Sequence, residues 1–268
     1  LHYNYLGSSL PPVWANMSAL QGLFLLFNEL TGTLPAEWAS LSQLQQLYIS
    51  DNKLSGSLPS SWGSLSQLRL FYSDYNNFTG SLPSAWASLS QLQQLYIYEN
   101  KLAGSLPAAW GSLSQLQYLY LDYNQLTGVV PPSWGSMSML LNLFLNANAL
   151  RGTVPAELGS LSALQFLYLY SNELSGPLPD SIQKIVPLQY LSVSGNRMNG
   201  SIPSELLVSL HLHFIDLSDN CFSGRVPYVL EMSSLHTVNV ALNPYLGGVI
   251  PDTSGAVNLT NLNISHSG

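Results

Sequence analysis

Eleven prolines divide the sequence at a constant interval, and this spacing limits the folds open to the chain more than any other feature. The interval is 24 residues throughout, and each proline follows Leu, Val or Ile. A fixed period of this length arises when one small structural unit is stacked many times, so it predicts a solenoid. The prolines are Pro11, Pro35, Pro59, Pro83, Pro107, Pro131, Pro155, Pro179, Pro203, Pro227 and Pro251.

Each column of the repeat has an expected structural role. In the copy Leu44–Pro59, apolar and polar residues alternate over Gln46–Ser50, which predicts a short strand with Leu47 and Ile49 pointing inward. A recurrent Asn is expected to bond backbone groups at the following turn and to form a ladder between repeats. A recurrent Gly indicates a tight turn. The segment after the proline, such as Ala36–Ser42, is expected to form a short outer helix that carries the six Trp residues into the core.

Together these columns spell LxxLxxLxLxxNxLxGxLPxxWxxL. The pattern resembles the 24-residue class of extracellular leucine-rich repeats known from plant receptor ectodomains and polygalacturonase inhibitors, through the LxGxLP part seen in Leu54–Pro59. The tryptophan variant in Leu34–Leu41 is more similar to kinetoplastid promastigote surface antigens. The resemblance covers the whole chain and implies an α/β solenoid of about 11 repeats. This would be a right-handed superhelix with a parallel concave β-sheet and short 3-10 or α helices on the convex side.

We expect residues 1–268 to form a single leucine-rich-repeat domain. Its repeats are near-identical over residues 1–179 and divergent over residues 180–268. Leu1 and Gly268 fall inside a repeat, and neither capping units nor paired capping cysteines are visible. Because solenoids need capping units for solubility, we expect the sequence to be a fragment of a longer protein. A surface anchor would then lie in a segment outside it.

The composition excludes some classes of partner. Only 8% of the residues are charged, the net charge is −7, and Lys and Arg together number 7. A nucleic-acid partner is therefore not expected, since no basic stripe is available to neutralise phosphates. No apolar run reaches the roughly 18 residues needed to cross a bilayer, so no membrane insertion is expected within this sequence. The resemblance implies an extracellular or cell-surface location and a non-enzymatic role in ligand binding or adhesion.

A line of aromatic residues along the expected concave face is the strongest functional signal. Eleven of the fifteen tyrosines fall on strand positions of this face. The repeat does not require aromatic side chains there, and an aromatic patch larger than a few hundred Å² normally marks an interaction site. We therefore predict that this face binds a protein or a glycan; the alternative is that the rings only support the sheet through cross-strand contacts. The candidate ligand-binding residues are Phe24, Tyr48, Tyr72, Tyr75, Tyr96, Tyr98, Tyr118, Tyr120, Tyr123, Phe144, Phe166, Tyr168, Tyr170 and Tyr190.

Acidic residues are interspersed among these aromatics, whereas the same columns contain no Lys or Arg. A ligand with basic groups, or a sugar stacked on the rings, would suit such a face, and a polyanion would not. The flanking columns include Ser50 together with the acids Asp51, Asp74, Glu99, Asp122, Asp216 and Asp219, all of which are expected to point toward solvent.

The sequence also bears on glycosylation, disulfide formation, metal binding and catalysis. The sequons at Asn16, Asn77, Asn199 and Asn258 predict glycosylation away from the aromatic residues if the chain is exported, and a fifth sequon is at Asn263. Cys221 is the only cysteine, so no disulfide closes within the sequence. The neighbouring His211, His213 and His236 do not supply the ligand set of a metal site, and we predict no metal, no cofactor and no catalytic residues.

Two other functions remain open at this point. Uncapped and weakly charged coils are also expected of a structural surface coat or a filament, for which self-assembly is the test. Ice binding by a regular repeat is a further alternative, but it requires a flat Thr-rich face, whereas the expected concave face is curved and rich in Tyr. A thermal hysteresis assay would decide that point.

Overall fold

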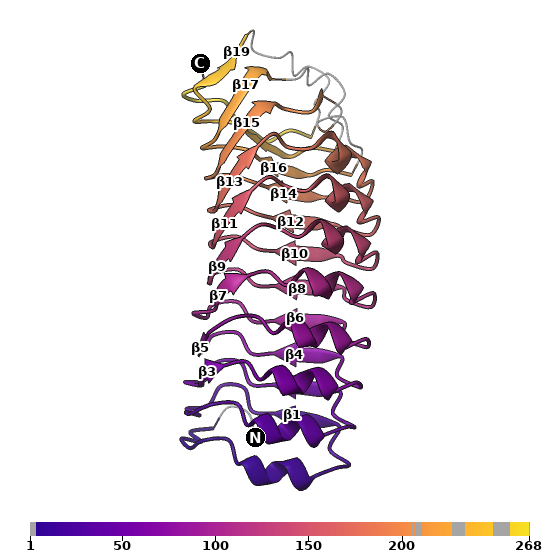
Figure 1. The fold of residues 1–268 in the computed structure, drawn as a ribbon. Helices are drawn as coiled ribbons and strands as arrows, with labels where there is room; N and C mark the ends of the chain where they lie inside the picture. The colour runs from indigo at the N-terminus through magenta and orange to yellow at the C-terminus, as the bar shows by residue number, and fades with distance from the viewer. Residues whose placement is uncertain (1–3, 205, 207–210, 227–233, 249–257, 268) are drawn as a thin grey trace. The chain divides into compact units, whose positions relative to one another are not determined.

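The computed structural model describes residues 4–204, 206, 211–226, 234–248 and 258–267. The expected roles of Pro227, Leu230 and Pro251 fall outside the described residues. The chain divides into two compact units, Leu1–Thr127 (unit 1) and Gly128–Gly268 (unit 2). Within each unit, Figure 1 shows the strands and the described short helices in separate columns.

In unit 1 the main sheet is parallel, as the repeat predicted. Its strands pair in chain order with a shift of one 24-residue repeat, so that Leu47 lies opposite Leu23 and Phe71. The strands are β1 (Gly22–Phe24), β2 (Gln46–Tyr48), β4 (Leu70–Tyr72), β6 (Gln94–Tyr96) and β8 (Tyr118–Tyr120). The helices are the 3-10 segments η1 (Pro12–Asn16), η2 (Ala36–Ser40), η3 (Ser60–Ser64), η4 (Ser84–Ser88) and η5 (Ala108–Ser112).

Unit 2 repeats this arrangement with less regular spacing. Phe214 lies opposite Thr237, a shift of 23 residues, where the neighbouring pairs keep 24. The main strands are β10 (Asn142–Phe144), β12 (Phe166–Tyr168), β14 (Tyr190–Ser192), β16 (Phe214–Asp216), β18 (Thr237–Asn239) and β20 (Asn261–Asn263). The described helices are η6 (Pro132–Ser136), η7 (Ala156–Ser160) and η8 (Asp180–Lys184). The pairing therefore loses one residue between β16 and β18 and keeps the 24-residue shift on either side.

The core consists of the inward strand residues and the helix tryptophans. Leu47 and Ile49 are fully buried, and Trp38, Trp62, Trp86, Trp110 and Trp134 are at most 1% exposed. Trp38 and Trp62 stack with ring centroids 6.1 Å apart. The indoles of Trp38, Trp62, Trp86 and Trp110 each donate a hydrogen bond to a proline carbonyl in the preceding repeat, as from Trp62 Nε1 to Pro35 O at 3.0 Å. The expected core role is confirmed except at Trp14, which is only half-buried.

The asparagine ladder is confirmed in detail. Asn52 Oδ1 accepts a hydrogen bond from Leu30 N at 3.0 Å, and its Nδ2 donates to Leu25 O, Ile49 O and Ser50 O. The same pattern recurs at Asn76 and at other members of the column. Each amide thus satisfies backbone groups of its own turn and of the previous repeat, which fixes the position of the turn that follows every main strand.

A second set of short strands, the side strands, lies beyond the turns that follow the main strands. The sequence pattern did not indicate these strands. In unit 1, β3 (Ser55–Ser57) pairs with β5 (Asn77–Thr79), and β7 (Ala103–Ser105) pairs with β9 (Gln125–Gly128). In unit 2 the order is β11 (Ala149–Gly152), β13 (Glu173–Gly176), β15 (Arg197–Ser201), β17 (Cys221–Arg225) and β19 (Tyr245–Gly247). The recurrent glycine lies in these strands. Gly56 has φ +79°, and a Cβ there would lie 2.7 Å from Thr33 Cγ2, so both conformation and space require Gly.

Candidate functional site

The tyrosines of the main strands in unit 1 form a continuous stack. Tyr48, Tyr72, Tyr96 and Tyr120 occupy equivalent strand positions, and consecutive ring centroids are 4.4 Å apart with interplanar angles of 4 to 6°. This separation is close to the spacing of about 4.8 Å between paired strands, so the sheet itself sets the distance between the rings. Phe24 ends the stack with its ring on edge to Tyr48 at 4.9 Å. All four Tyr side chains are half-buried, so the stack supports the sheet while one edge remains accessible.

Burial affects the phenol groups of this stack. Desolvation and the neighbouring Tyr48 raise the pKa of Tyr72 to about 12. Desolvation, together with Tyr120 and Tyr72, raises the pKa of Tyr96 further above its ordinary value. The Tyr72 hydroxyl donates a hydrogen bond to Gln94 Oε1. The stack therefore presents neutral hydroxyl groups, which can donate and accept hydrogen bonds, throughout the physiological pH range.

Among the candidate ligand-binding residues, the most exposed rings belong to the residue immediately before the ladder asparagine. Tyr75 is 47% exposed and Tyr123 is 46% exposed. Both have a left-handed backbone, with φ of 51° and 50°. Tyr75 packs its edge against Tyr98 with centroids 5.3 Å apart, and Tyr98 in turn contacts Tyr120 at 6.3 Å. These rings extend the accessible aromatic surface beyond the stack.

Two of the acids do not point into solvent as expected. Asp74 and Asp122 are 6% and 8% exposed, and Ser50 is 3% exposed. The expectation was wrong because the column of these side chains lies beside the aromatic rings, which bury them. Hydrogen bonds between residues of the column also keep these side chains in place. Ser50 Oγ donates to Asp74 Oδ1 at 2.6 Å, and the Tyr98 hydroxyl also donates to Asp74.

Burial raises the pKa values of these carboxyl groups. Desolvation raises the pKa of Asp74, although hydrogen bonds from Ser50 and Tyr98 oppose the shift. Desolvation, with smaller contributions from the charges of Glu99 and Asp74, raises the pKa of Asp122 to about 7. Asp122 Oδ1 is buried and has no hydrogen-bond partner. This unpartnered acceptor was not apparent from the sequence, and the alternation of acid and Tyr across neighbouring repeats is the only signal that could have indicated it.

Aromatic residues also stack within unit 2. Phe144 and Tyr168 stack with centroids 4.6 Å apart, and Phe166 and Tyr190 stack at 4.7 Å. Tyr170 lies edge-on to Tyr168 at 6.0 Å. In the two repeats after Tyr168, the equivalent strand position is polar instead of aromatic. Ser192 is buried there, and Asp216 accepts hydrogen bonds from Ser218. Tyr118, in unit 1, lies edge-on to Tyr120 at 6.5 Å.

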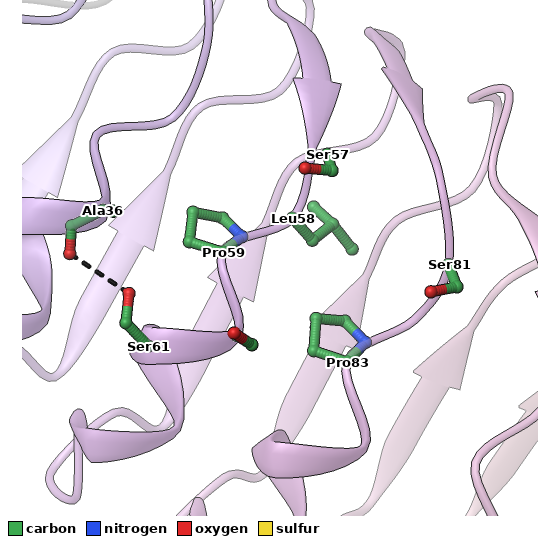
Figure 2. Close-up of a pocket in the computed structure, with 8 residues that line it drawn as sticks. Ala36, Ser57, Leu58, Pro59, Ser61, Ser81 and Pro83 are labelled. Atoms are coloured by element: carbon green, nitrogen blue, oxygen red, sulfur yellow. Dashed lines mark hydrogen bonds between the residues drawn. The ribbon is translucent and has the colours of Figure 1, made fainter.

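An open groove lies on another side of unit 1, between successive Leu-Pro segments. It has a volume of about 500 Å³ and is lined by Ser57, Ser81, Pro59 and Pro83 among others. Figure 2 shows the two proline rings on either side of it and the hydrogen bond of 3.2 Å from Ser61 Oγ to Ala36 O. A similar groove recurs one repeat earlier. Because no titratable side chain lines the groove in Figure 2, we do not regard it as a catalytic site.

The remaining candidate residues lie away from the tyrosine stack. Asn16 is exposed in η1, Asn77 lies in β5, and Asn199 is exposed in β15, while Asn258 is exposed near β20. Cys221 is exposed in β17. The rings of His213 and His236 are 5.4 Å apart. No group of three potential metal ligands occurs in the described part of the chain. Among those residues, no helix is long and apolar enough to cross a bilayer.

Comparisons with known proteins agree with this architecture. Leucine-rich-repeat family models match residues 64–126 and 114–174, and also 43–65 and 187–208, which together make up more than half of the chain. The chain therefore belongs to the leucine-rich-repeat proteins, and within them to the class that resembles plant receptor ectodomains. No curated protein matches it by sequence. The similarity to kinetoplastid surface antigens remains an expectation.

Solved structures give the same class. The ectodomain of the Arabidopsis thaliana receptor kinase GASSHO1/SCHENGEN3, in complex with CASPARIAN STRIP INTEGRITY FACTOR 2, is 32% identical over 98% of this chain, with a TM-score of 0.88. The plant peptide hormone receptor RGFR1 in complex with RGF2 is 30% identical over 98% of the chain, with a TM-score of 0.89. The chain spans 35% and 46% of the lengths of these two proteins. A plant ice-binding protein is 28% identical over 85% of this chain and 73% of its own, with a TM-score of 0.74.

Proposed function

We propose that the chain is a recognition module, extracellular or exposed at a cell surface, that binds a protein or peptide ligand through the tyrosine face of unit 1. We define this face as Phe24, Tyr48, Tyr72, Tyr75, Tyr96, Tyr98, Tyr118, Tyr120 and Tyr123. The observation that carries the proposal is the pair of nearly half-exposed rings, Tyr75 and Tyr123, beside a continuous stack of half-buried ones. Such rings offer large, rigid and amphipathic contact area at a low entropic cost, which suits recognition.

The comparisons support a peptide or protein ligand over a glycan. Both receptor ectodomains described above were solved with a bound peptide factor or hormone. The unit 2 residues Phe144, Phe166, Tyr168, Tyr170 and Tyr190 would extend the contact with a longer ligand. Glycans at Asn16, Asn77, Asn199 or Asn258 would leave the tyrosine face open, because these residues lie in helices, side strands or loops. The role is one of binding, and we assign no reaction to it.

The test compares exposed rings of the tyrosine face with an exposed ring elsewhere on the chain. The intact chain is used to probe peptide, protein and glycan arrays, and any ligand found is titrated against a Tyr75→Ser/Tyr123→Ser variant. We expect this variant to keep its circular dichroism spectrum and to bind at least about tenfold more weakly, since large aromatic anchors dominate binding energy. A matched control is Tyr245→Ser, which removes a side chain that is 67% exposed in β19. Equal ligand affinity in the parent and the double variant would show that the face is not the site.

Ice binding is a second candidate, and the side strands favour it. The curved, Tyr-rich surface that argues against ice binding is the tyrosine face alone. In the side strands and the residues that follow them, hydroxyl residues flank the recurrent glycine, as in Ser55–Ser57 and Thr79–Ser81. Thr79 and Ser81 are exposed, and the similarity to the plant ice-binding protein supports the same function. Thermal hysteresis by the parent chain that disappears in a Thr79→Lys variant would support this function. A parent without thermal hysteresis would exclude it.

Assembly into a coat or filament is the remaining alternative. It predicts that the purified chain forms large species at micromolar concentration. Sedimentation velocity separates it from the recognition role, because a monodisperse monomer is incompatible with a self-assembling coat.

A further inference from the structure

The two residues before each ladder asparagine alternate between acid and Tyr along unit 1. They read Ser50-Asp51, Asp74-Tyr75, Tyr98-Glu99 and Asp122-Tyr123 in successive repeats, so acids and rings exchange places from one strand to the next. With about 4.8 Å between strands, four carboxyl groups lie within roughly 14 Å along the sheet. We call this group the acidic–tyrosine cluster: Asp51, Asp74, Tyr75, Glu99, Asp122 and Tyr123.

These carboxyl groups lack counter-ions. The cations of unit 1 are Lys53, Arg69 and Lys101. Lys53 pairs with Glu29 at 3.2 Å, and Lys101 donates to Asn77 Oδ1 at 2.8 Å. Arg69 precedes β4, at the opposite end of that strand from the cluster. Among the described residues, no ion pair involves any of the four acids of the cluster.

The acids interact with one another unfavourably. After desolvation, the charge of Asp74 is the cause that raises the pKa of Asp51. The pKa of Tyr75 is raised by desolvation and then by the charges of Glu99, Asp51, Asp74 and Asp122. The cluster thus concentrates negative charge, and none of its acids forms an ion pair with another described residue.

A hydrogen-bond acceptor within the cluster is also left unsatisfied. Asp122 is more than nine-tenths buried and its Oδ1 has no partner. A buried acceptor without a donor costs about 1–3 kcal/mol, and more if it is charged. Asp74 differs, since Ser50 and Tyr98 both donate to it. Because Asp122 Oδ1 is buried, a cationic ligand would favour this carboxylate through charge, while its hydrogen bonds would go to the more accessible acids Asp51 and Glu99.

We propose that the acidic–tyrosine cluster is the subsite for an arginine or lysine side chain of a peptide ligand. This inference rests on the proposed recognition function and specifies its ligand. A guanidinium or ammonium group would lie between the half-exposed rings of Tyr75 and Tyr123, which favour cations over their faces. The half-buried carboxylates of Asp51 and Glu99 would accept its hydrogen bonds. Unit 2 lacks this arrangement, since Asn146-Ala147 and Tyr170-Ser171 occupy the equivalent positions.

The experiment uses fluorescein-labelled hexa-arginine as the probe and fluorescence anisotropy as the readout. Binding to the intact parent chain is compared with binding to Asp51→Asn/Glu99→Gln. The matched control is Glu37→Gln/Glu157→Gln, which removes the same charge from exposed positions in η2 and η7. We expect the cluster variant to bind at least about tenfold more weakly and the control variant to change by less than about twofold, because exposed distant charges contribute little. Labelled hexa-glutamate should not bind.

The outcomes distinguish this inference from the broader function. Equal weakening in the two variants would reduce the effect to net charge and overturn the subsite, as would failure of hexa-arginine to bind the parent chain. If an array ligand is lost in Tyr75→Ser/Tyr123→Ser but retained in Asp51→Asn/Glu99→Gln, the recognition function stands and the cation subsite does not. If that ligand survives the Tyr substitutions, the recognition function itself is wrong.

Discussion

Replacing Asp122 by Asn should stabilise unit 1 in a manner that depends on pH. The pKa of Asp122 in the folded chain is about 7, mainly because of desolvation, against an ordinary value of 3.8. Since the folded state holds its proton more tightly than the unfolded state, ionisation of Asp122 costs stability. That cost begins as the pH rises above the unfolded value and is complete once the pH exceeds the folded value.

The magnitude follows from the two pKa values. The interval from 3.8 to about 7 corresponds to up to about 4 kcal/mol, at 1.36 kcal/mol for each tenfold change in proton affinity. Asn is isosteric and has no such cost, and Asn146 shows that the equivalent column accommodates a buried Asn. We therefore expect the Asp122→Asn variant and the parent to differ little at about pH 3, and the variant to be more stable at about pH 8.5.

Urea denaturation followed by tryptophan fluorescence provides the measurement, because four buried tryptophans lie in unit 1: Trp38, Trp62, Trp86 and Trp110. The difference between variant and parent at each pH cancels the titration of groups that the two proteins share. Glu99 and Asp74 contribute to the shift and remain present in both. A stability difference that is the same at both pH values would refute the reasoning, because it would show that Asp122 titrates alike in the folded and unfolded chains.

Two further substitutions test the structural roles of the repeat. Asn52→Ala should leave the buried Leu30 N–H without its acceptor and destabilise unit 1 by about 1–3 kcal/mol in urea denaturation, whereas an unchanged midpoint would contradict the ladder. Gly63→Ala should destabilise by about 1–3 kcal/mol, because its Cβ would lie 2.5 Å from the Ala85 carbonyl oxygen. Gly7→Ala, whose Cβ would lie 3.9 Å from the Tyr5 carbonyl oxygen, is the control expected to show a smaller effect.

The regular columns of the repeat were predictable because each has one dominant physical requirement. Asn52 must satisfy backbone groups in every turn, and Leu47 and Ile49 must be buried in every strand. Repetition makes such requirements visible, since a position that tolerated substitution would vary between copies. The parallel sheet and the outer helices follow from the same columns.

The candidate site was only partly predictable, because it depends on which neighbours differ between repeats. The alternation of Tyr48 with Leu47 placed the ring on the open face of the sheet, but nothing local indicated that Asp74 would be covered. Its burial results from Tyr98 in the next repeat and Ser50 in the previous one. The side strands were missed because Ser55–Ser57 contains a glycine and no apolar alternation, which are the features used to recognise strands.

The conformation of the residue before the ladder asparagine bears on why large side chains occur there. Tyr75 and Tyr123 have positive φ values, which cost a residue other than Gly about 1–2 kcal/mol. Gly195 occupies the same column in unit 2, so the fold accepts glycine at this position. Rings that are nearly half exposed recover only part of that cost through burial. Tyr75 also packs on Tyr98, and the proposed ligand contact would offset the remaining cost at these two positions. Under this argument, Tyr75→Ser/Tyr123→Ser should separate binding from stability.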